Sequence, residues 1–260
     1  MRAFAVFVVA LVAIAAAPAT AHPQRIALVV GNNDYHGGLH RLTNARNDAE
    51  LMTAVLKKAG FDVEPVVDAR RPDLAAAISR FTQRLKQAGP DAVGLFYFAG
   101  HGLQYDGTNY LLATDATVED PADISRKGVD AVQILWALQD GGAATSILII
   151  DACRQDRVSL ALRPVAEDGL TRLDKKGLDK RRNVIVAYST GPGEAAADGE
   201  RSDGNSPFAK ILAENILVPN KGIIEMFRNV TVEMVENFDQ KPWLDLGWTA
   251  REEFVFVGGS

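Results

Sequence analysis

The sequence of 260 residues contains a single cysteine, Cys153. One thiol cannot form an intramolecular disulfide, so a fold held together by disulfides is excluded. A free thiol would be open to oxidation if the protein is exported, as the N-terminal segment discussed below predicts. A cysteine kept under that risk suggests a chemical role.

The chain also lacks an excess of basic charge, since 28 Lys and Arg stand against 33 Asp and Glu and the net charge is −5. No basic stripe runs along the sequence. Nucleic-acid binding usually needs such a stripe. We therefore expect no nucleic-acid partner and turn to protein, peptide and small-molecule chemistry.

Phosphate-binding and metal-binding motifs are missing as well. The segment Gly31-Asn32-Asn33-Asp34 follows an apolar strand but does not have the G-x-G-x-x-G spacing, which argues against a dinucleotide- or flavin-binding domain. His36 and His40 are four residues apart, yet the two glycines between them disfavour the helix that would align the pair on a metal. No metal and no cofactor are expected.

A long apolar run occurs only near the N-terminus, over residues 3–17, and the small-residue site Ala19-Thr20-Ala21 follows it. This arrangement predicts a secretory signal peptide over residues 1–21, with a membrane anchor as the alternative. The expected location is the periplasm or the exterior, without membrane attachment after cleavage. Residues 22–260 are then predicted to form one domain, with a core over about 25–257.

What the chain does contain is a regular alternation of short apolar runs and amphipathic stretches. Runs rich in β-branched residues predict strands, and apolar residues at three- and four-residue spacing predict helices. The expected strands cover 25–30, 61–67, 92–99, 147–150, 183–188 and 254–257, and the expected helices 44–59, 72–88, 129–138, 207–216 and 223–238. Asp106-Gly107 between short runs predicts a hairpin. This order predicts an α/β fold with a mostly parallel six-stranded sheet and helices on both faces.

Two of the predicted strands end at chemically reactive residues. The strand over 92–99 leads to His101, and the strand over 147–150 leads to Cys153, which follows His101 by 52 positions. That spacing leaves room for one crossover with a helix, so parallel neighbours would bring both residues to the same sheet edge. A thiol and an imidazole that meet there form a nucleophile–base pair.

These residues lie in segments that resemble a known family. FAGHG at residues 98–102 and DACR at residues 151–154 are similar to the histidine and cysteine motifs of the caspase-like peptidases. RIALVVGNNDY, LTNARNDAELM and GTNYLLATDA resemble the metacaspase and paracaspase branch, and NSPFAKIL resembles its bacterial members. The resemblance covers about residues 25–257 and implies the caspase-like three-layer sandwich and a cysteine peptidase activity.

The resemblance also implies roles for the site residues. Cys153 would be the nucleophile and His101 the base and later the acid, while the backbone N–H groups of Gly102 and Cys153 would hold the oxyanion. Two alternatives remain: an inert buried thiol beside a loop histidine, and an inactive caspase-like module that binds other proteins.

Substrate preference is expected to come from carboxylates. The caspase motif has a glutamine two residues before the cysteine, whereas this chain has Asp151. A carboxylate there would repel an acidic P1 side chain and favour Arg or Lys. Asp48 and Asp198 lie where basic-specific relatives place acids. The alternatives are that Asp48 only complements a helix dipole and that Asp198 is a solvated loop residue.

The segment 154–182 differs from the rest of the chain in composition. It is rich in charge, contains Pro164, Gly169 and Gly177, and is predicted to be a mobile loop. Its end carries a basic cluster where caspases are cut between their subunits: Lys175, Lys176, Lys180, Arg181 and Arg182. Self-processing and an uncut surface loop are both consistent with this pattern, and the oligomeric state is not indicated.

Overall fold

The protein is described by a computed structural model over residues 23–153, 173, 177–180, 182–191, 199, 204–247 and 253–259. The predicted signal peptide and most of the predicted mobile loop lie outside these residues. Among the helices of the described part, none is long and apolar enough to cross a membrane.

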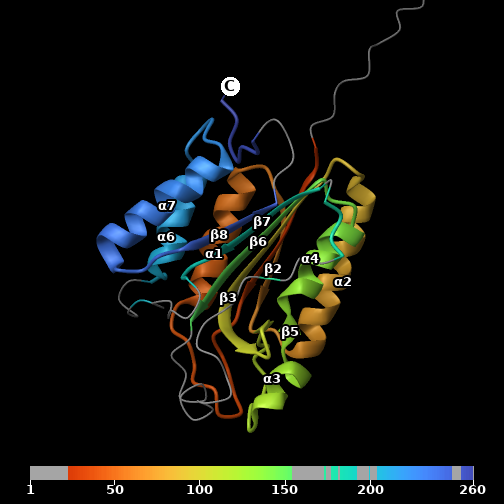
Figure 1. Cartoon of the computed structure of the whole chain (residues 1–260), viewed down its shortest axis with the longest axis vertical. Helices are drawn as coiled ribbons and strands as arrows, with labels where there is room; N and C mark the ends of the chain where they lie inside the picture. The colour runs from red at the N-terminus through yellow and green to blue at the C-terminus, as the bar shows by residue number, and fades with distance from the viewer. Residues whose placement is uncertain are drawn as a thin grey trace, which may run out of the picture.

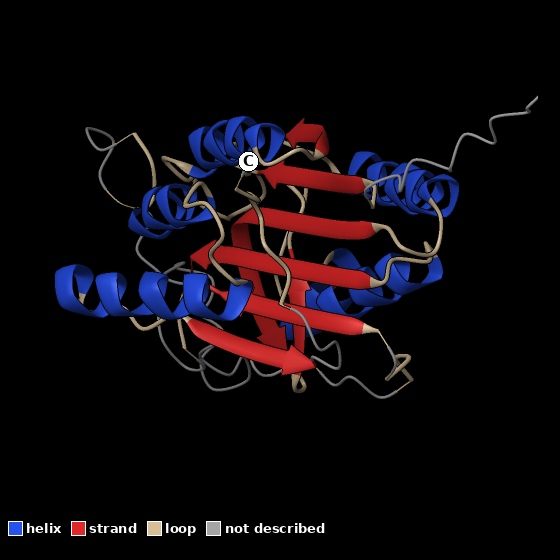
Figure 2. Ribbon diagram, turned by 90° about the horizontal axis from the view of Figure 1, so that it is seen from above, coloured by secondary structure: helices blue, strands red, loops and turns tan. Residues whose placement is uncertain are grey.

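A twisted sheet forms the centre of the molecule. Within the described residues its main path follows the order β2-β1-β3-β6-β7-β8. The strands are β1 (Arg25–Gly31), β2 (Asp62–Val67), β3 (Val93–Tyr105), β6 (Thr145–Cys153), β7 (Asn183–Tyr188) and β8 (Trp243–Gly247). Each pairs in parallel with its neighbour except β8, which runs antiparallel to β7. Figure 2 shows the strands side by side, with one edge strand running against the others.

Helices cover both faces of this sheet (Figure 1). One face is covered by α1 (Ala45–Lys58), α6 (Pro207–Ile216) and α7 (Ile223–Phe238), and the other by α2 (Arg71–Ala88) and α4 (Ala131–Asp140). The predicted α/β class, the mostly parallel six-stranded sheet and the helices on both faces are therefore confirmed.

The strands separate two apolar cores because successive side chains point to opposite faces. In β6, Ile147 and Ile149 belong to the core under α1, α6 and α7, whereas Leu148 and Ile150 belong to the core under α2 and α4. A strand buried on both faces is apolar at every position, which is why a continuous run predicted it.

The strand β3 is longer than the sequence predicted. It continues through His101 to Tyr105, and its final part forms an antiparallel hairpin with β4 (Thr108–Leu111). The turn residues Asp106 and Gly107 both have positive φ, at 49° and 69°. An Asp-Gly pair tolerates this conformation and matches the twist of the strands, so the predicted hairpin is confirmed.

The segment before β6 contains more elements than the single helix predicted over residues 129–138. A short helix, α3 (Pro121–Lys127), and a two-residue strand, β5 (Val129–Asp130), precede α4. The side chain of Asp130 accepts a hydrogen bond from the Val132 N–H at 2.8 Å and begins α4 there. A seven-residue helix spans too few turns to show a clear apolar period, so the sequence did not predict it.

The last predicted strand was wrong. Over residues 254–257 the structure has only an isolated bridge between Val255 and Gly222, and the antiparallel edge strand is β8. β8 has five residues with the buried Asp245 at its centre, so it lacks the apolar run that identified the other strands. Trp243 belongs to this strand.

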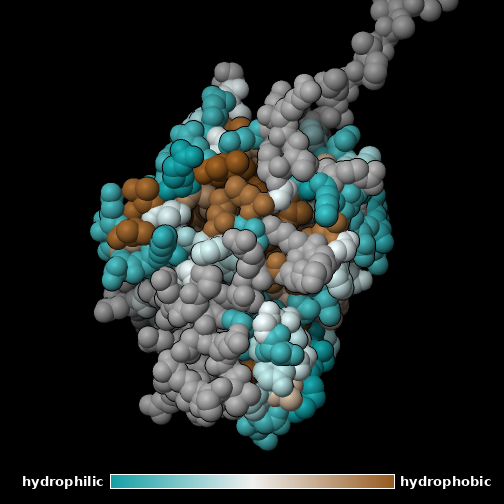
Figure 3. All heavy atoms as spheres, in the orientation of Figure 1, coloured by the Kyte–Doolittle hydropathy of each residue, from teal (hydrophilic) through white to brown (hydrophobic). Residues whose placement is uncertain are grey.

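Some large apolar side chains remain at the surface near this edge. Val232, Val235 and Phe238 of α7 and Leu246 of β8 are exposed. Figure 3 shows apolar surface in the region of α7 and β8. Four of the seven exposed large apolar side chains among the described residues therefore lie on α7 and β8.

Asp68, directly after β2, anchors the loop that leaves β1. Its Oδ1 accepts the N–H of Asn33 at 2.7 Å and of Asp34 at 2.9 Å, and its Oδ2 pairs with Arg46. Burial, the largest single influence, raises the pKa of the Asp68 carboxyl, but these hydrogen bonds and the Arg46 charge together lower it below its usual value. Ionised Asp68 therefore stabilises the folded loop.

The substitution Asp68→Asn tests this contribution. A group with a lowered folded pKa stabilises the protein above its unfolded pKa of about 3.9, and the contribution is lost as the pH falls through the folded value. Urea titrations at several pH values measure the free energy of unfolding. We expect it to be about 1 kcal/mol lower in the variant than in the wild type at pH 7, with a smaller difference toward pH 3. Asp91→Asn, at an exposed loop position, is the control. A difference independent of pH would contradict the assignment.

Candidate functional site

The carboxyl ends of β3 and β6 form the centre of the candidate site. These strands pair in parallel from Val93 and Thr145 to His101 and Cys153, which occupy the same register position. Neighbouring strands lie about 4.8 Å apart. The structure therefore places the backbone of the two predicted catalytic residues side by side, while the side chain of Cys153 lies outside the described part.

His101 is almost completely buried, with 2% of its surface exposed. Tyr35, from the loop after β1, packs its ring on the imidazole with centroids 4.3 Å apart. The Tyr35 hydroxyl accepts the backbone N–H of His101 at 2.8 Å and donates to the Leu112 carbonyl at 3.1 Å. Tyr35 thus supports both the ring and the backbone of His101.

A second contact determines the tautomer of His101. Its Nε2 lies 2.9 Å from the backbone carbonyl oxygen of His40. A carbonyl oxygen only accepts hydrogen bonds, so Nε2 carries the hydrogen. In the neutral imidazole the lone pair is then on Nδ1, and that nitrogen is the one able to take up a proton.

Gly100 is required by this close packing. A Cβ at this position would lie 2.5 Å from the Tyr35 hydroxyl and 2.7 Å from the Phe98 ring. Both distances are shorter than any ordinary carbon contact, so a larger residue would displace the tyrosine that supports His101. Gly102, the other flanking glycine, is buried in β3 opposite Leu111 of β4.

Two of the three predicted specificity acids lie close to one residue, Ser206. Asp151 of β6 is 3% exposed, and its Oδ2 accepts hydrogen bonds from the Ser206 hydroxyl at 2.7 Å and the Tyr97 hydroxyl at 3.3 Å. Asp48, in the first turn of α1, is 1% exposed, and its Oδ1 accepts the Ser206 N–H at 2.8 Å. Asp48 and Asp151 thus come from distant parts of the chain to the start of α6.

Asp198, the third predicted acid, lies outside the described residues, as do most members of the predicted basic cluster. Among the residues the structure describes, no three His, Cys, Asp or Glu side chains are grouped so that they could hold a metal ion.

Several residues that build the site were not predicted from the sequence. Tyr35, Tyr97 and the carbonyl of His40 contact the candidate catalytic and specificity residues, and Ser206, the N-cap of α6, contacts Asp48 and Asp151. Tyr35 and Ser206 lie within the motif segments RIALVVGNNDY and NSPFAKIL, and this was the available signal for both. The contacts themselves depend on strand order and loop placement.

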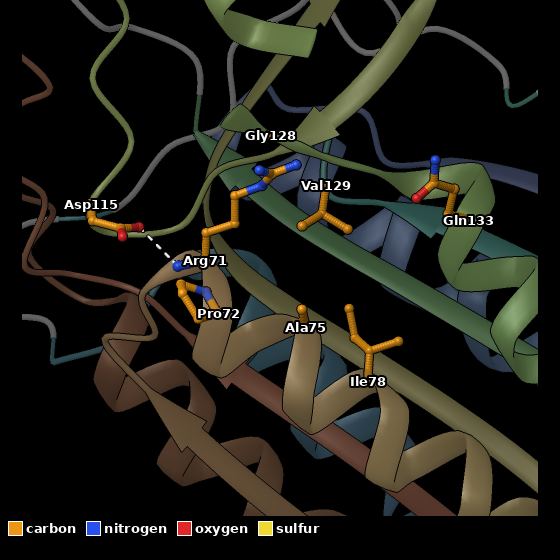
Figure 4. Close-up of a pocket in the computed structure, with 8 residues that line it drawn as sticks. All are labelled: Arg71, Pro72, Ala75, Ile78, Asp115, Gly128, Val129 and Gln133. Carbon is orange, nitrogen blue, oxygen red and sulfur yellow. Dashed lines mark hydrogen bonds between the residues drawn. The ribbon is translucent and has the colours of Figure 1, made fainter. Parts of the chain in front are cut away.

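A separate cavity of about 620 Å³ lies beside the N-terminus of α2 (Figure 4). Ala75, Ile78 and Val129 provide apolar walls, and Arg71 and Gln133 contribute polar groups. The lining of this cavity contains none of the predicted site residues and no nucleophile–base pair.

Comparisons with known proteins agree with this architecture. A model of the caspase domain matches residues 24–251. The mucosa-associated lymphoid tissue lymphoma translocation protein 1 of Homo sapiens is 26% identical over 200 residues, which are 76% of this chain and 22% of that protein. The chain thus spans about a fifth of the length of this relative. The uncharacterized protein y4kE of Sinorhizobium fredii is 35% identical over 92 residues, 34% of this chain and 26% of that protein.

Solved structures show the same fold. Caspase-1 from Spodoptera frugiperda aligns with a TM-score of 0.64 and 17% identity over 91% of each chain. Protein GSU0716 from Geobacter sulfurreducens aligns with a TM-score of 0.61 and 17% identity over 92% of this chain and 95% of its own. Because the caspase-domain model covers most of the chain and the fold agrees, the protein belongs to the caspase family of cysteine peptidases.

Proposed function

We propose that this protein is an active endopeptidase that uses Cys153 and His101 and cleaves after Arg or Lys. The observation that carries the proposal is the shared register of the two residues at the ends of β3 and β6. The supported orientation of the imidazole adds to it, since Nδ1 is left able to accept a proton.

The proposed reaction begins with proton transfer from the Cys153 thiol to Nδ1 of His101. The thiolate attacks the peptide carbonyl carbon, and the backbone N–H groups of Gly102 and Cys153 stabilise the resulting oxyanion. The imidazolium returns its proton to the leaving amine as the C–N bond breaks. Water, deprotonated by the same imidazole, then hydrolyses the thioester and restores the thiol.

The carbonyl oxygen of His40 would accept a hydrogen bond from the His101 Nε2–H throughout this reaction cycle. When the imidazole is protonated, its positive charge strengthens the hydrogen bond to the carbonyl dipole. Tyr35 would limit movement of the ring at the same time. These contacts favour one ring orientation through both proton transfers.

The preference for basic P1 residues rests on the two buried acids. Asp151 lies on β6, two residues before Cys153, and Asp48 is joined to Asp151 through the hydrogen bonds of Ser206. Carboxylates favour guanidinium and ammonium groups and repel acidic ones. Asp198 is proposed as a third acid of the S1 pocket, the site that would bind the P1 side chain.

The competing function is an inactive caspase-like module that binds other proteins. Both candidates have the same fold, and a peptide-cleavage assay separates them. We expect the protein to cleave a fluorogenic peptide with Arg at P1, and Cys153→Ala or His101→Ala to lower kcat/KM by about a thousandfold or more.

His36→Ala is the matched control, because His36 is an exposed histidine in the loop that also carries Tyr35. It is expected to retain wild-type activity. Absence of cleavage by the wild type, or cleavage unaffected by the two substitutions, would reject the peptidase proposal in favour of the binding module.

The substitution Asp151→Asn tests the P1 preference. The amide oxygen can still accept from Tyr97 and Ser206, so the main change is the loss of charge. We expect KM for an Arg-P1 peptide to rise about tenfold or more, while a neutral citrulline-P1 peptide is unaffected, in steady-state kinetics. Equal effects on both peptides would argue against a carboxylate contact, and turnover only after acidic P1 residues would remove the proposed specificity.

Export by the N-terminal segment is also proposed. When the full chain is expressed with an intact secretion system, mass spectrometry of the exported protein is expected to find His22 at the N-terminus. An exported protein that retains residues 1–21 would instead support a membrane anchor.

A further inference from the structure

The short segment over residues 204–206 is held against the first turn of α1. Asn47 donates its Nδ2–H to the Gly204 carbonyl at 2.6 Å, and Asn205 donates its Nδ2–H to Asp48 Oδ1 at 3.0 Å. The Ser206 N–H donates to the same oxygen at 2.8 Å. The last residues before α6 therefore determine where the Asp48 carboxylate lies.

The side chain of Ser206 makes a second set of contacts. Its hydroxyl donates to Asp151 Oδ2 at 2.7 Å and accepts the N–H of Ala209 at 3.0 Å. A hydroxyl has one hydrogen to donate and lone pairs to accept, so both bonds form at once. Ser206 thereby links α1, the end of β6 and the start of α6.

These bonds matter because both carboxylates are nearly inaccessible to water, at 1% and 3% exposure for Asp48 and Asp151. A buried carboxylate stays ionised and oriented when hydrogen-bond donors replace its lost water. Ser206 supplies one donor to each acid, and the N-terminus of α6 adds its partial positive charge.

We propose that Ser206 is a positioning residue that sets the orientation of the Asp48 and Asp151 carboxylates. Through them it would set the affinity for a basic P1 side chain. This inference rests on the proposed function and assigns its specificity to a residue that does not itself contact the reacting atoms. Binding of a guanidinium by carboxylates depends on the orientation of the carboxylates. Loss of the Ser206 hydroxyl donor should therefore weaken binding of the P1 side chain more than it slows the chemical step.

The test compares Ser206→Ala with Ser206→Thr. Alanine keeps the backbone bond to Asp48 but removes the donor to Asp151, whereas threonine keeps a hydroxyl. For an Arg-P1 peptide we expect Ser206→Ala to raise KM about tenfold with kcat changed less than about twofold, and Ser206→Thr to stay near the wild type.

The pH profile provides a second measurement. Loss of a donor to the charged form raises the pKa of a carboxyl group. We therefore expect the acidic limb of kcat/KM for the Arg-P1 peptide to move to higher pH in Ser206→Ala. A citrulline-P1 peptide should not show this movement, because it does not depend on the carboxylate charge.

Ser206 also caps α6, and a matched control separates that structural role. Asp130→Ala removes the cap of α4, which has ten residues like α6, and lies outside the proposed site. Both alanine variants should lower Tm, but only Ser206→Ala should change KM. If Ser206→Ala lowers Tm and leaves KM and the acidic limb as in the wild type, the inference is wrong and Ser206 is only a helix cap.

Binding to the Cys153→Ala protein distinguishes this inference from the proposed function. A labelled peptide with an internal Arg is titrated by fluorescence polarisation against Cys153→Ala and against Cys153→Ala/Ser206→Ala. Suppose that the wild type does not cleave the peptide, but Cys153→Ala/Ser206→Ala binds it at least about tenfold more weakly than Cys153→Ala does. The inference then stands without the peptidase activity. If the wild type cleaves after Arg and both proteins bind equally, the inference fails and the proposed function remains. If neither protein prefers the Arg peptide to its citrulline analogue, the inference fails.

Discussion

The parallel pairing of β3 with β6 is the interaction on which the rest of the structure depends. The register runs without interruption from Val93 and Thr145 to His101 and Cys153. In a parallel ladder, a shift of one residue would move His101 out of step with Cys153 and reverse the faces of every side chain in one strand. Such a shift would also turn the buried Asp151 to the opposite face of the sheet and break its hydrogen bonds with Tyr97 and Ser206. Buried polar contacts at the end of β6 therefore favour the register that aligns the candidate catalytic pair.

A second constraint acts where the sheet ends, because polar groups are buried there. His101, Asp48 and Asp151 are all nearly inaccessible, and each is bonded to a group from a distant part of the chain. Burial without such partners would cost free energy. The loop after β1 supplies Tyr35 and the carbonyl of His40, and the start of α6 supplies Ser206. These loops thus support both the proposed chemistry and the fold.

Much of the fold could be predicted from the sequence, since buried strands and amphipathic helices have distinct patterns. The boundaries of α1, α7 and β7 differ from the prediction by one residue or less. The errors lie where the pattern is weak: α3 is too short to show a period, and β8 contains the buried Asp245. The more apolar pattern of residues 254–257 predicts the closing strand there, but the edge position is occupied by β8.

The sequence by itself determined the alternation of strands and helices, the positions of His101 and Cys153 at strand ends, and Asp151 two residues before the cysteine. Each of these depends on residues close together in the chain. Only the tertiary structure decided that β3 and β6 are neighbours in matching register, that Tyr35 and the His40 carbonyl orient the imidazole, and that Ser206 joins Asp48 to Asp151. The paired strand residues are 52 positions apart, and the hydrogen bonds link residues 55 to 158 positions apart. Hydrogen-bond partners at such separations follow from how strands are ordered and loops are packed, and no local pattern specifies them.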